Sequence, residues 1–188
     1  MFNHVMLDLE TLSLKNNAAI FSIGAVKMDL KNFTLGPEFY IPVKPESSEA
    51  AGLHVSVATL KWWTDQSSEA KRVFTDTQAV SLGQALGLFD KFVRSDAPIE
   101  GIWGHGSAFD NVILRNAYAA LGYQCPWSHR MDLCFRTMRV LFPMPQPEDK
   151  GVVHNALDDA RRQARSLCAG LQRLRACEAA YAMLPSQE

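Results

Sequence analysis

The sequence predicts an α/β fold in which helices pack on both faces of a mixed central sheet. Three segments rich in apolar residues come first in the 188-residue chain, at 5–11, 19–28 and 33–43. Short polar turns separate them, a succession that is typical of three antiparallel strands. Helical patterns then alternate with a further strand at 99–103. Strands reached through a helix are expected to join the sheet in parallel.

Each of the first three strands has its own signal. Residues 5–11 alternate apolar side chains with two carboxylates, and residues 19–28 are rich in β-branched and apolar side chains. Residues 29–32 are expected to form a turn. The third strand ends at Pro42 and Pro45, because proline cannot donate a hydrogen bond to a central ladder.

The helices before the fourth strand follow from caps and apolar stripes. Residues 46–54 are interpreted as a loop, Ser56 as the N-cap of a helix at 58–63, and residues 68–74 as a further helix. The clearest helix is expected at 81–94. Its apolar residues fall on one stripe, and they are Leu82, Ala85, Leu86, Phe89 and Val93.

Helical patterns dominate the second half of the chain. Ser107 is expected to open a helix that Gly122 stops, since glycine favours the conformation that ends helices. Residues 126–130 are interpreted as a connector or short strand, 131–141 as helical, and 143–147, with three prolines, as a stiff loop. The last helix is expected to run from Asn155 to about Met183.

Composition restricts the class of protein. Hydrophobic residues make up 47% and charged residues 21%, so the chain is expected to form one globular domain over residues 1–188. The net charge of −1 provides no broad positive field, so a polyanionic partner must be bound over a short footprint. Four cysteines without metal-binding spacing, no signal-peptide pattern and no apolar run of about 20 residues favour a cytoplasmic protein without a membrane segment.

Two carboxylates mark the first strand as the centre of a site. Asp8 and Glu10 are two residues apart, so their side chains point to the same face, while Val5, Leu7 and Leu9 point to the other. Two acids on one face of an apolar strand repel each other unless a cation lies between them. Their oxygen ligands suit Mg²⁺ or Mn²⁺. The alternative is a strand end with two solvated acids.

A second acidic position follows the fourth strand. Gly104 and Gly106 flank His105, and this loop leads to Ser107 and Asp110. The glycines allow the backbone to approach a ligand closely. Asp110 is a candidate metal ligand, but Ser107 and Asp110 also fit a helix-capping pattern. His105 is a candidate contact residue or a solvated loop histidine.

The start of the last helix supplies the third position. His154 is followed by Asp158 and Asp159. The apolar stripe of this helix places Asp158 almost opposite the sheet and Asp159 on the flank that faces it. Asp159 is therefore the candidate site residue, whereas Asp158 is expected to complement the helix dipole. His154 belongs to the loop before the helix. Arg161, Arg162 and Arg165 are expected on the outer face as surface charge.

Taken together, these positions resemble the DEDDh (DnaQ-like) 3′→5′ exonucleases, which have a ribonuclease H-like fold. The matching residues are Asp8, Glu10 and Asp110, followed by the pattern His-x-Ala-x-x-Asp at 154–159, and the resemblance spans residues 5 to about 165. The segment 60–63, with Trp62 and Trp63, also resembles a small phage-type and bacterial group that includes a mycobacterial 3′→5′ exoribonuclease.

The resemblance implies a metal-dependent mechanism. Two divalent cations, Mg²⁺ or Mn²⁺, would lie about 4 Å apart at the scissile phosphate. Asp8 would bridge both ions, Glu10 and Asp159 would complete one coordination shell, and Asp110 would support the other. His154 would be the general base, since its ordinary pKa of about 6.5 suits proton transfer at neutral pH.

The resemblance also implies a pocket for the 3′-terminal nucleotide. The candidate substrate contacts come from three segments, and they are Thr11, Leu12, His105, Ser107, Trp62 and Trp63. Either Trp62 or Trp63 could stack on a base. The alternative, favoured for at least one of them, is that one tryptophan fills the core and the other is a partly buried residue at the rim. Arg130, Arg136 and Arg139 are weaker candidates for phosphate contacts.

The expected function is hydrolysis of single-stranded DNA or RNA from the 3′ end to nucleoside monophosphates. The residues do not decide between the two sugars, because the 2′-hydroxyl is read by a few pocket contacts. Two alternatives stay open: a catalytically idle ribonuclease H-like binding module, and an endonucleolytic relative. The aromatic content is compatible with a homodimer.

Overall fold

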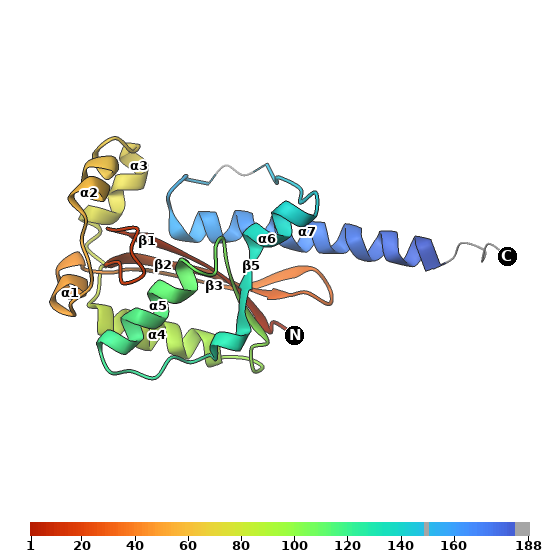
Figure 1. Ribbon diagram of the computed structural model, residues 1–188, viewed down its shortest axis with the longest axis horizontal. Coiled ribbons are helices and arrows are strands. Elements are labelled where there is room, and N and C mark those ends of the chain that lie inside the picture. Colours follow the sequence, from red (N-terminus) through yellow and green to blue (C-terminus); the bar gives the residue numbers. More distant parts are fainter. Residues whose placement is uncertain (149–150, 183–188) are drawn as a thin grey trace.

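A five-stranded mixed sheet forms the centre of the molecule (Figure 1). The computed structural model describes residues 1–148 and 151–182. The strands, in chain order, are β1 (His4–Thr11), β2 (Ile20–Asp29), β3 (Thr34–Pro42), β4 (Gly101–Gly104) and β5 (Asp132–Cys134). Their order in the sheet is β3-β2-β1-β4-β5. β1, β2 and β3 pair in antiparallel fashion, whereas β4 pairs in parallel with β1 and with β5, so the predicted mixed sheet is confirmed.

Helices cover both faces of the sheet. The α-helices are α1 (Pro45–Ala50), α2 (Val57–Thr64), α3 (Ser68–Lys71), α4 (Leu82–Arg94), α5 (Asp110–Ala120), α6 (Phe135–Leu141) and α7 (Ala156–Ala182). Two 3-10 helices, Arg72–Thr75 and His129–Met131, complete the described elements. α7 crosses one face and contacts β1, β2 and β3, while α4 and α5 pack on the other. Figure 1 shows that α7 continues well beyond the end of the sheet.

Several predicted helix starts are confirmed by their caps. The Ser56 side chain accepts a hydrogen bond from the backbone of Thr59 at the start of α2. Ser81 and Gln84 form a reciprocal capping box at the start of α4, whose predicted apolar stripe is buried. α7 begins one residue after Asn155, as expected. Met183, where its end was expected, lies outside the described residues.

Three local predictions are wrong. The segment 46–54 was expected to be a loop but contains most of α1. Pro45 starts this helix at a position where proline has no backbone donor to lose. The segment 131–141 was expected to be helical throughout but contains β5, because pairing with β4 holds this short stretch extended. α5 starts at Asp110 after Phe109 without a side-chain cap, so the predicted Ser107 cap is absent.

The sheet separates two apolar cores. Leu7 and Leu9 of β1 belong to the core beneath α4 and α5, whereas Met6 belongs to the core beneath α7. α7 approaches β2 so closely that a Cβ atom at Gly24 would lie 2.2 Å from the backbone carbon of Ala156. Among the described residues, no helix has the length and apolar composition needed to cross a membrane.

Candidate active site

The alternation of β1 directs two acids to the face that α7 covers. Leu7 and Leu9 are buried in the opposite core, so Asp8 and Glu10 point toward α7. Asp8 lies opposite Gly24 of β2. Glu10 is only 8% exposed. The predicted pair of carboxylates therefore shares one face of a central strand.

Asp110 joins this pair because β4 is short. The parallel pairing of β1 with β4 ends at Leu7 and Gly104, which leaves the backbone amide of Leu9 without a partner strand on that side. Asp110 Oδ1 accepts a hydrogen bond from the Leu9 amide at 3.2 Å. The absence of a side chain at Gly104 permits this approach, since a Cβ there would lie 3.1 Å from Asp110 Oδ2.

The first turn of α7 separates the two acids that follow His154. Asp159 Oδ2 accepts a hydrogen bond from the His154 backbone amide at 3.1 Å, and the Asp159 carboxylate also pairs with Arg162. Asp158 instead accepts from the Val152 amide at 2.9 Å and pairs with Arg161 at 2.8 Å. Asp159 therefore faces the loop that carries His154, as deduced from the apolar stripe, whereas Asp158 is linked through Arg161 to Glu38 of β3.

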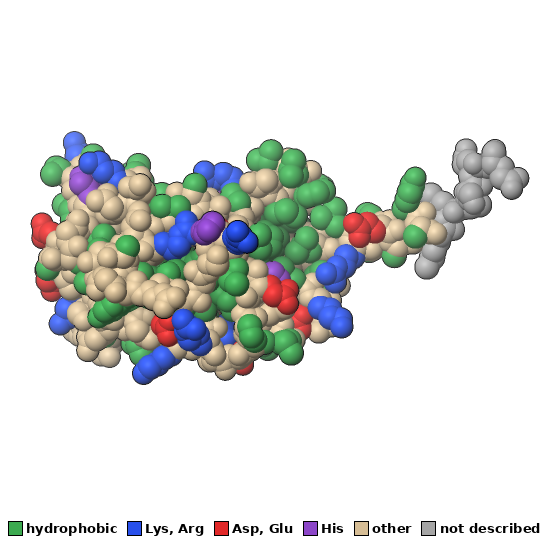
Figure 2. Space-filling view, turned by 60° about the horizontal axis from the view of Figure 1, so that its bottom comes forward, with side chains coloured by type: hydrophobic (Ala, Val, Ile, Leu, Met, Phe, Trp, Pro, Cys, Tyr) green, Lys and Arg blue, Asp and Glu red, His purple; other side chains and the backbone are tan. Residues whose placement is uncertain are grey.

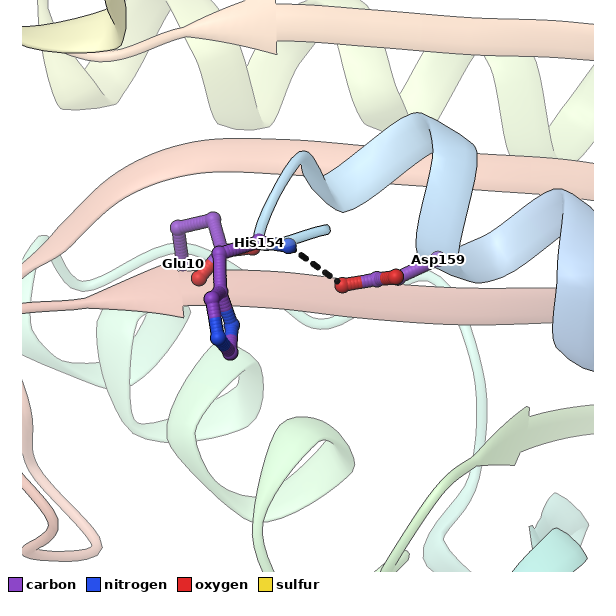
Figure 3. Close-up of side chains that lie close together, drawn as sticks. All are labelled: Glu10, His154 and Asp159. Carbon is purple, nitrogen blue, oxygen red and sulfur yellow. Dashed lines mark hydrogen bonds between the residues drawn. The ribbon is translucent and has the colours of Figure 1, made fainter. Parts of the chain in front are cut away.

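His154 brings the loop before α7 to the carboxylates. Its backbone φ angle is +63°, a conformation that few residues other than glycine adopt. One ligand atom from each of Glu10, His154 and Asp159 lies within 4.8 Å of the other two. Figure 3 shows these side chains converging from β1, the loop and α7. The imidazole packs edge-on against Trp62, with ring centroids 4.9 Å apart.

Two residues of α7 at this site were not identified from the sequence. Gln163 is 8% exposed, and its Nε2 atom donates a hydrogen bond to Asp8 Oδ1 at 2.7 Å. Arg162 was expected to be surface charge, but it pairs with Asp159. Both positions could have been found from helical spacing, because residues three and four after Asp159 share its face.

The pKa values of three carboxylates at this site are raised by their surroundings. Burial is the main cause that raises the pKa of Glu10 to about 8 and that of Asp110 to about 7, and repulsion from Asp110 also acts on Glu10. Burial, and then repulsion from Asp110 and Glu10, raises the pKa of Asp8 well above its ordinary value. The cluster is therefore electrostatically unfavourable in its fully ionised form without added positive charge.

An apolar cavity of about 380 Å³ opens beside Glu10. Thr11, Trp62 and Trp63 are among the residues that line it. Trp63 is 3% exposed and donates a hydrogen bond to the Thr11 carbonyl, whereas Trp62 is 43% exposed at the rim. This is the expected division between the two tryptophans. Leu12 is 2% exposed in the core, so its side chain does not reach the cavity, in contrast to the expectation.

The glycine loop borders a second cavity at the carboxylates. His105 lines a second, polar cavity of about 200 Å³ together with Asp8 and Asp159. Ser107 hydrogen-bonds to the thiol of Cys134 at the end of β5, and it lines neither of these two cavities. Of the two loop residues predicted to contact substrate, only His105 therefore borders the site.

Comparisons with known proteins agree with this arrangement. A family model for the 3′-5′ exoribonuclease Rv2179c-like domain matches residues 3–170. The nuclease domain of 3′hExo, a DEDDh family member bound to rAMP, is similar with a TM-score of 0.66 and 15% identity, over 90% of this chain and 92% of that one.

Exonuclease I of E. coli in complex with a dT13 oligonucleotide has a TM-score of 0.64 and 16% identity, over 92% of this chain and 42% of that chain. This chain therefore spans less than half of the Exonuclease I chain. These similarities confirm the predicted ribonuclease H-like fold. Among curated protein sequences, none gives a significant match.

Proposed function

Since this chain belongs to the family of 3′-5′ exoribonuclease Rv2179c-like domains and is a 3′-5′ exonuclease, we propose that it releases nucleoside monophosphates from single-stranded RNA. The single observation that carries the proposal is the convergence of acids from three distant segments, with Asp8 and Glu10 on β1, Asp110 on α5 and Asp159 on α7. DNA is the second candidate substrate, because the similar Exonuclease I structure holds a DNA oligonucleotide.

The chemistry of these side chains fits divalent cations. All four acids offer hard carboxylate oxygens, and the burial that raises the pKa values of Asp8, Glu10 and Asp110 gives them a strong preference for compensating positive charge. We propose that the four acids hold two ions, Mg²⁺ or Mn²⁺. When bound, such ions would stabilise the additional negative charge of the phosphate in the hydrolysis transition state.

His154 is proposed as the general base. Burial, followed by the charge of Arg162, lowers the pKa of its imidazole, so the ring is neutral at pH 7 and can accept a proton from water. The hydrogen bond from its backbone to Asp159 fixes the loop that carries the ring. Trp62 then restricts the ring through the edge-on contact.

The apolar cavity is proposed to bind the 3′-terminal nucleoside. Its volume lies within the usual range of small-molecule sites, and it borders Glu10 and Thr11 at the carboxylates. Trp62 at its rim offers an aromatic face for a base. Basic side chains occur in small groups rather than as a continuous band on the face in Figure 2, which is consistent with a short footprint.

The decisive test is a time course on matched RNA and DNA oligonucleotides carrying a 5′ label. With Mn²⁺ we expect a ladder of products shortened one nucleotide at a time, faster on RNA, and no cleavage with EDTA. Asp8→Ala and Asp159→Ala are expected to lose cleavage by a factor of 10³ or more while the fold is retained in circular dichroism.

Other results would favour the alternatives. A protein that binds the oligonucleotide but leaves it intact in the presence of Mn²⁺ would be an idle binding module. Cleavage of a circular single strand would indicate an endonuclease. Full activity of the Asp8→Ala variant would remove the proposed site.

The domain organisation, cellular location and oligomeric state of the enzyme are also proposals. We propose that residues 1–188 act as one domain in the cytoplasm, where the four cysteines, all free in the structure, stay reduced. A homodimer is proposed as the form in solution, since apolar side chains such as Val140 and Leu141 stay exposed. Light scattering of the purified protein measures the mass of this form.

A further inference from the structure

The polar cavity and the apolar cavity border different carboxylates of the site. Asp8 and Asp159 form part of its wall, whereas Glu10 lines the apolar cavity, and the two cavities have no lining residue in common. The remaining wall of the polar cavity includes Arg139 of α6, Arg162 of α7 and Gln146 of the intervening loop. The acids therefore border both an apolar space and a polar space that contains two guanidinium groups.

Of the two arginines that line the polar cavity, Arg139 is the one without an acidic partner among the described residues. Arg162 is paired with Asp159. Arg139 Nη1 lies 3.2 Å from His105 Nε2, and no ion pair links Arg139 to an acid in the described part of the chain. Burial lowers the pKa of His105, and the charges of Arg139 and Arg136 lower it further. The ring is therefore neutral and does not replace an anion as the partner of Arg139.

The 3′-to-5′ direction of a bound strand determines which part of it reaches each cavity. If the terminal nucleoside occupies the apolar cavity and the scissile linkage lies at the acids, the strand must leave past Asp8 and Asp159. The next phosphate toward the 5′ end then meets the polar cavity. A volume of about 200 Å³ suits a phosphate group and water better than a nucleoside, and guanidinium is the side chain that best matches phosphate oxygens.

We propose that this cavity is a phosphate subsite, in which Arg139 binds the second linkage from the 3′ end, one removed from the linkage that is cut. The inference rests on the proposed exonuclease function. It explains why a protein of net charge −1 can hold a polyanion over a short footprint. Gln146 supplies an amide donor to the same phosphate.

The test combines a change in the protein with a change in the substrate. Release of the first nucleotide is measured in single turnover, below saturation, on an oligonucleotide with a neutral methylphosphonate at the second linkage. For the unaltered protein we expect release to slow about 10-fold, because one charge-assisted hydrogen bond is lost. On the unmodified strand, Arg139→Ala should slow release by about the same factor. In the Arg139→Ala variant, the methylphosphonate should then slow release by less than about 2-fold more.

The controls separate this subsite from general electrostatics. A methylphosphonate at the fifth linkage should leave release unchanged, as should Arg173→Ala, which removes an exposed arginine of the same long helix that holds Arg162. Arg139→Lys should recover part of the rate, because it keeps the charge without the planar fork.

Two results would overturn the subsite: additive effects of Arg139→Ala and the second-linkage methylphosphonate, or an Arg139→Ala variant as fast as the unaltered protein. Failure of the unaltered protein to shorten the unmodified strand would instead overturn the proposed function itself.

Discussion

Gln163 holds the orientation of the Asp8 carboxylate. Its Nε2 atom donates to Asp8 Oδ1, while its own Oε1 is buried without a hydrogen-bond partner among the described residues. The carboxylate is planar, so a hydrogen bond that holds Oδ1 also restricts the position of Oδ2, the oxygen left free to bind an ion. Side chains that orient metal ligands typically change metal affinity 10- to 100-fold when they are removed.

We therefore expect Gln163→Leu to weaken Mn²⁺ binding by about 10-fold or more. Calorimetric titration of the metal-free protein measures this directly, and the Mn²⁺ concentration needed for half-maximal cleavage should rise in parallel. Gln172→Leu is the matched control, since Gln172 is exposed on the same helix. Equal Mn²⁺ affinity in the Gln163 variant and the control would show that the hydrogen bond does not position Asp8 for the ion.

Of the two adjacent tryptophans, Trp62 is expected to matter for activity and Trp63 for stability. Trp62→Ala should reduce kcat/KM about 10-fold or more with little change in Tm, because Trp62 is exposed at the cavity rim and packs on His154. Trp63→Ala should lower the free energy of unfolding by about 3–5 kcal/mol, because Trp63 fills the core. Thermal unfolding and initial rates distinguish the two, and a Trp62 variant with unchanged kcat/KM would contradict its proposed role.

The acids of the site were predicted from the sequence, whereas their partners Arg162 and Gln163 were missed, although their spacing from Asp159 on the helix is a usable signal. Strand alternation and helix phase are strict geometric rules, so they placed Asp8, Glu10 and Asp159 on the correct faces. Arg162 was assigned to the surface because helix phase gives the direction of Cβ, whereas a long side chain can reach back to a neighbour. Leu12 was expected beside the terminal nucleotide, but its side chain lies in the core, which its local sequence pattern does not signal.

At the scale of elements, the contact between β2 and α7 sets the position of Asp159. The start of α7 rests on Gly24, which lies opposite Asp8 in the sheet. Gly24→Ala is expected to push the first turn of α7 away from β1, since the new methyl group would meet backbone rather than a flexible side chain. Overpacking of this kind typically destabilises by about 1–3 kcal/mol, and a displacement of about 1 Å can reduce a rate about 10²-fold.

Chemical denaturation and initial rates check this expectation for Gly24→Ala. Gly87→Ala provides the comparison, because no atom lies within 4 Å of the added methyl group and alanine favours the helix by up to about 1 kcal/mol. The expectation fails if the Gly24 variant retains the full rate.

The two elements that the sequence did not predict, α1 and β5, are both short. The first three strands and α4 carry several consecutive alternations or an apolar stripe, so the periodic signal is repeated. α1 and β5 are six and three residues long, too short for any period to be recognised. β5 exists because β4 offers it a pairing edge, which is a tertiary effect rather than a local preference.

For the whole molecule, the acid cluster links stability to pH. Glu10, Asp110 and Asp8 have pKa values raised above their unfolded values, with about 8 for Glu10 and about 7 for Asp110. The folded protein therefore binds more protons than the unfolded chain between about pH 4 and pH 8. Their contribution to stability is present below the unfolded pKa and is lost as the pH rises through 7 and 8.

We expect the acid cluster to lower the Tm of the metal-free protein, measured in EDTA, as the pH rises from 5 to 8, against the opposite contribution of His4, His105 and His154, whose pKa values burial lowers. Mn²⁺ should raise the Tm most at the high end of this range, because the ionised cluster binds the cation and the unfolded chain does not. Glu10→Gln removes one of the raised groups, so the Tm of the unaltered protein in EDTA should fall relative to that of the variant as the pH rises. The same dependence of Tm on pH in both proteins would contradict the expectation.

The sheet divides the site between two cores, since Asp110 is anchored with α5 on one side and Asp159 with α7 on the other. Two cations bridged by Asp8 would link Asp110 and Asp159 through the ions, in addition to the hydrogen bonds that already join α5 and α7 to β1. Local opening of the α7 N-terminus would then require the ions to dissociate first. Amide hydrogen exchange in the first turns of α7 should therefore slow when Mn²⁺ is added, whereas exchange in α4, which carries no proposed ligand, should stay the same.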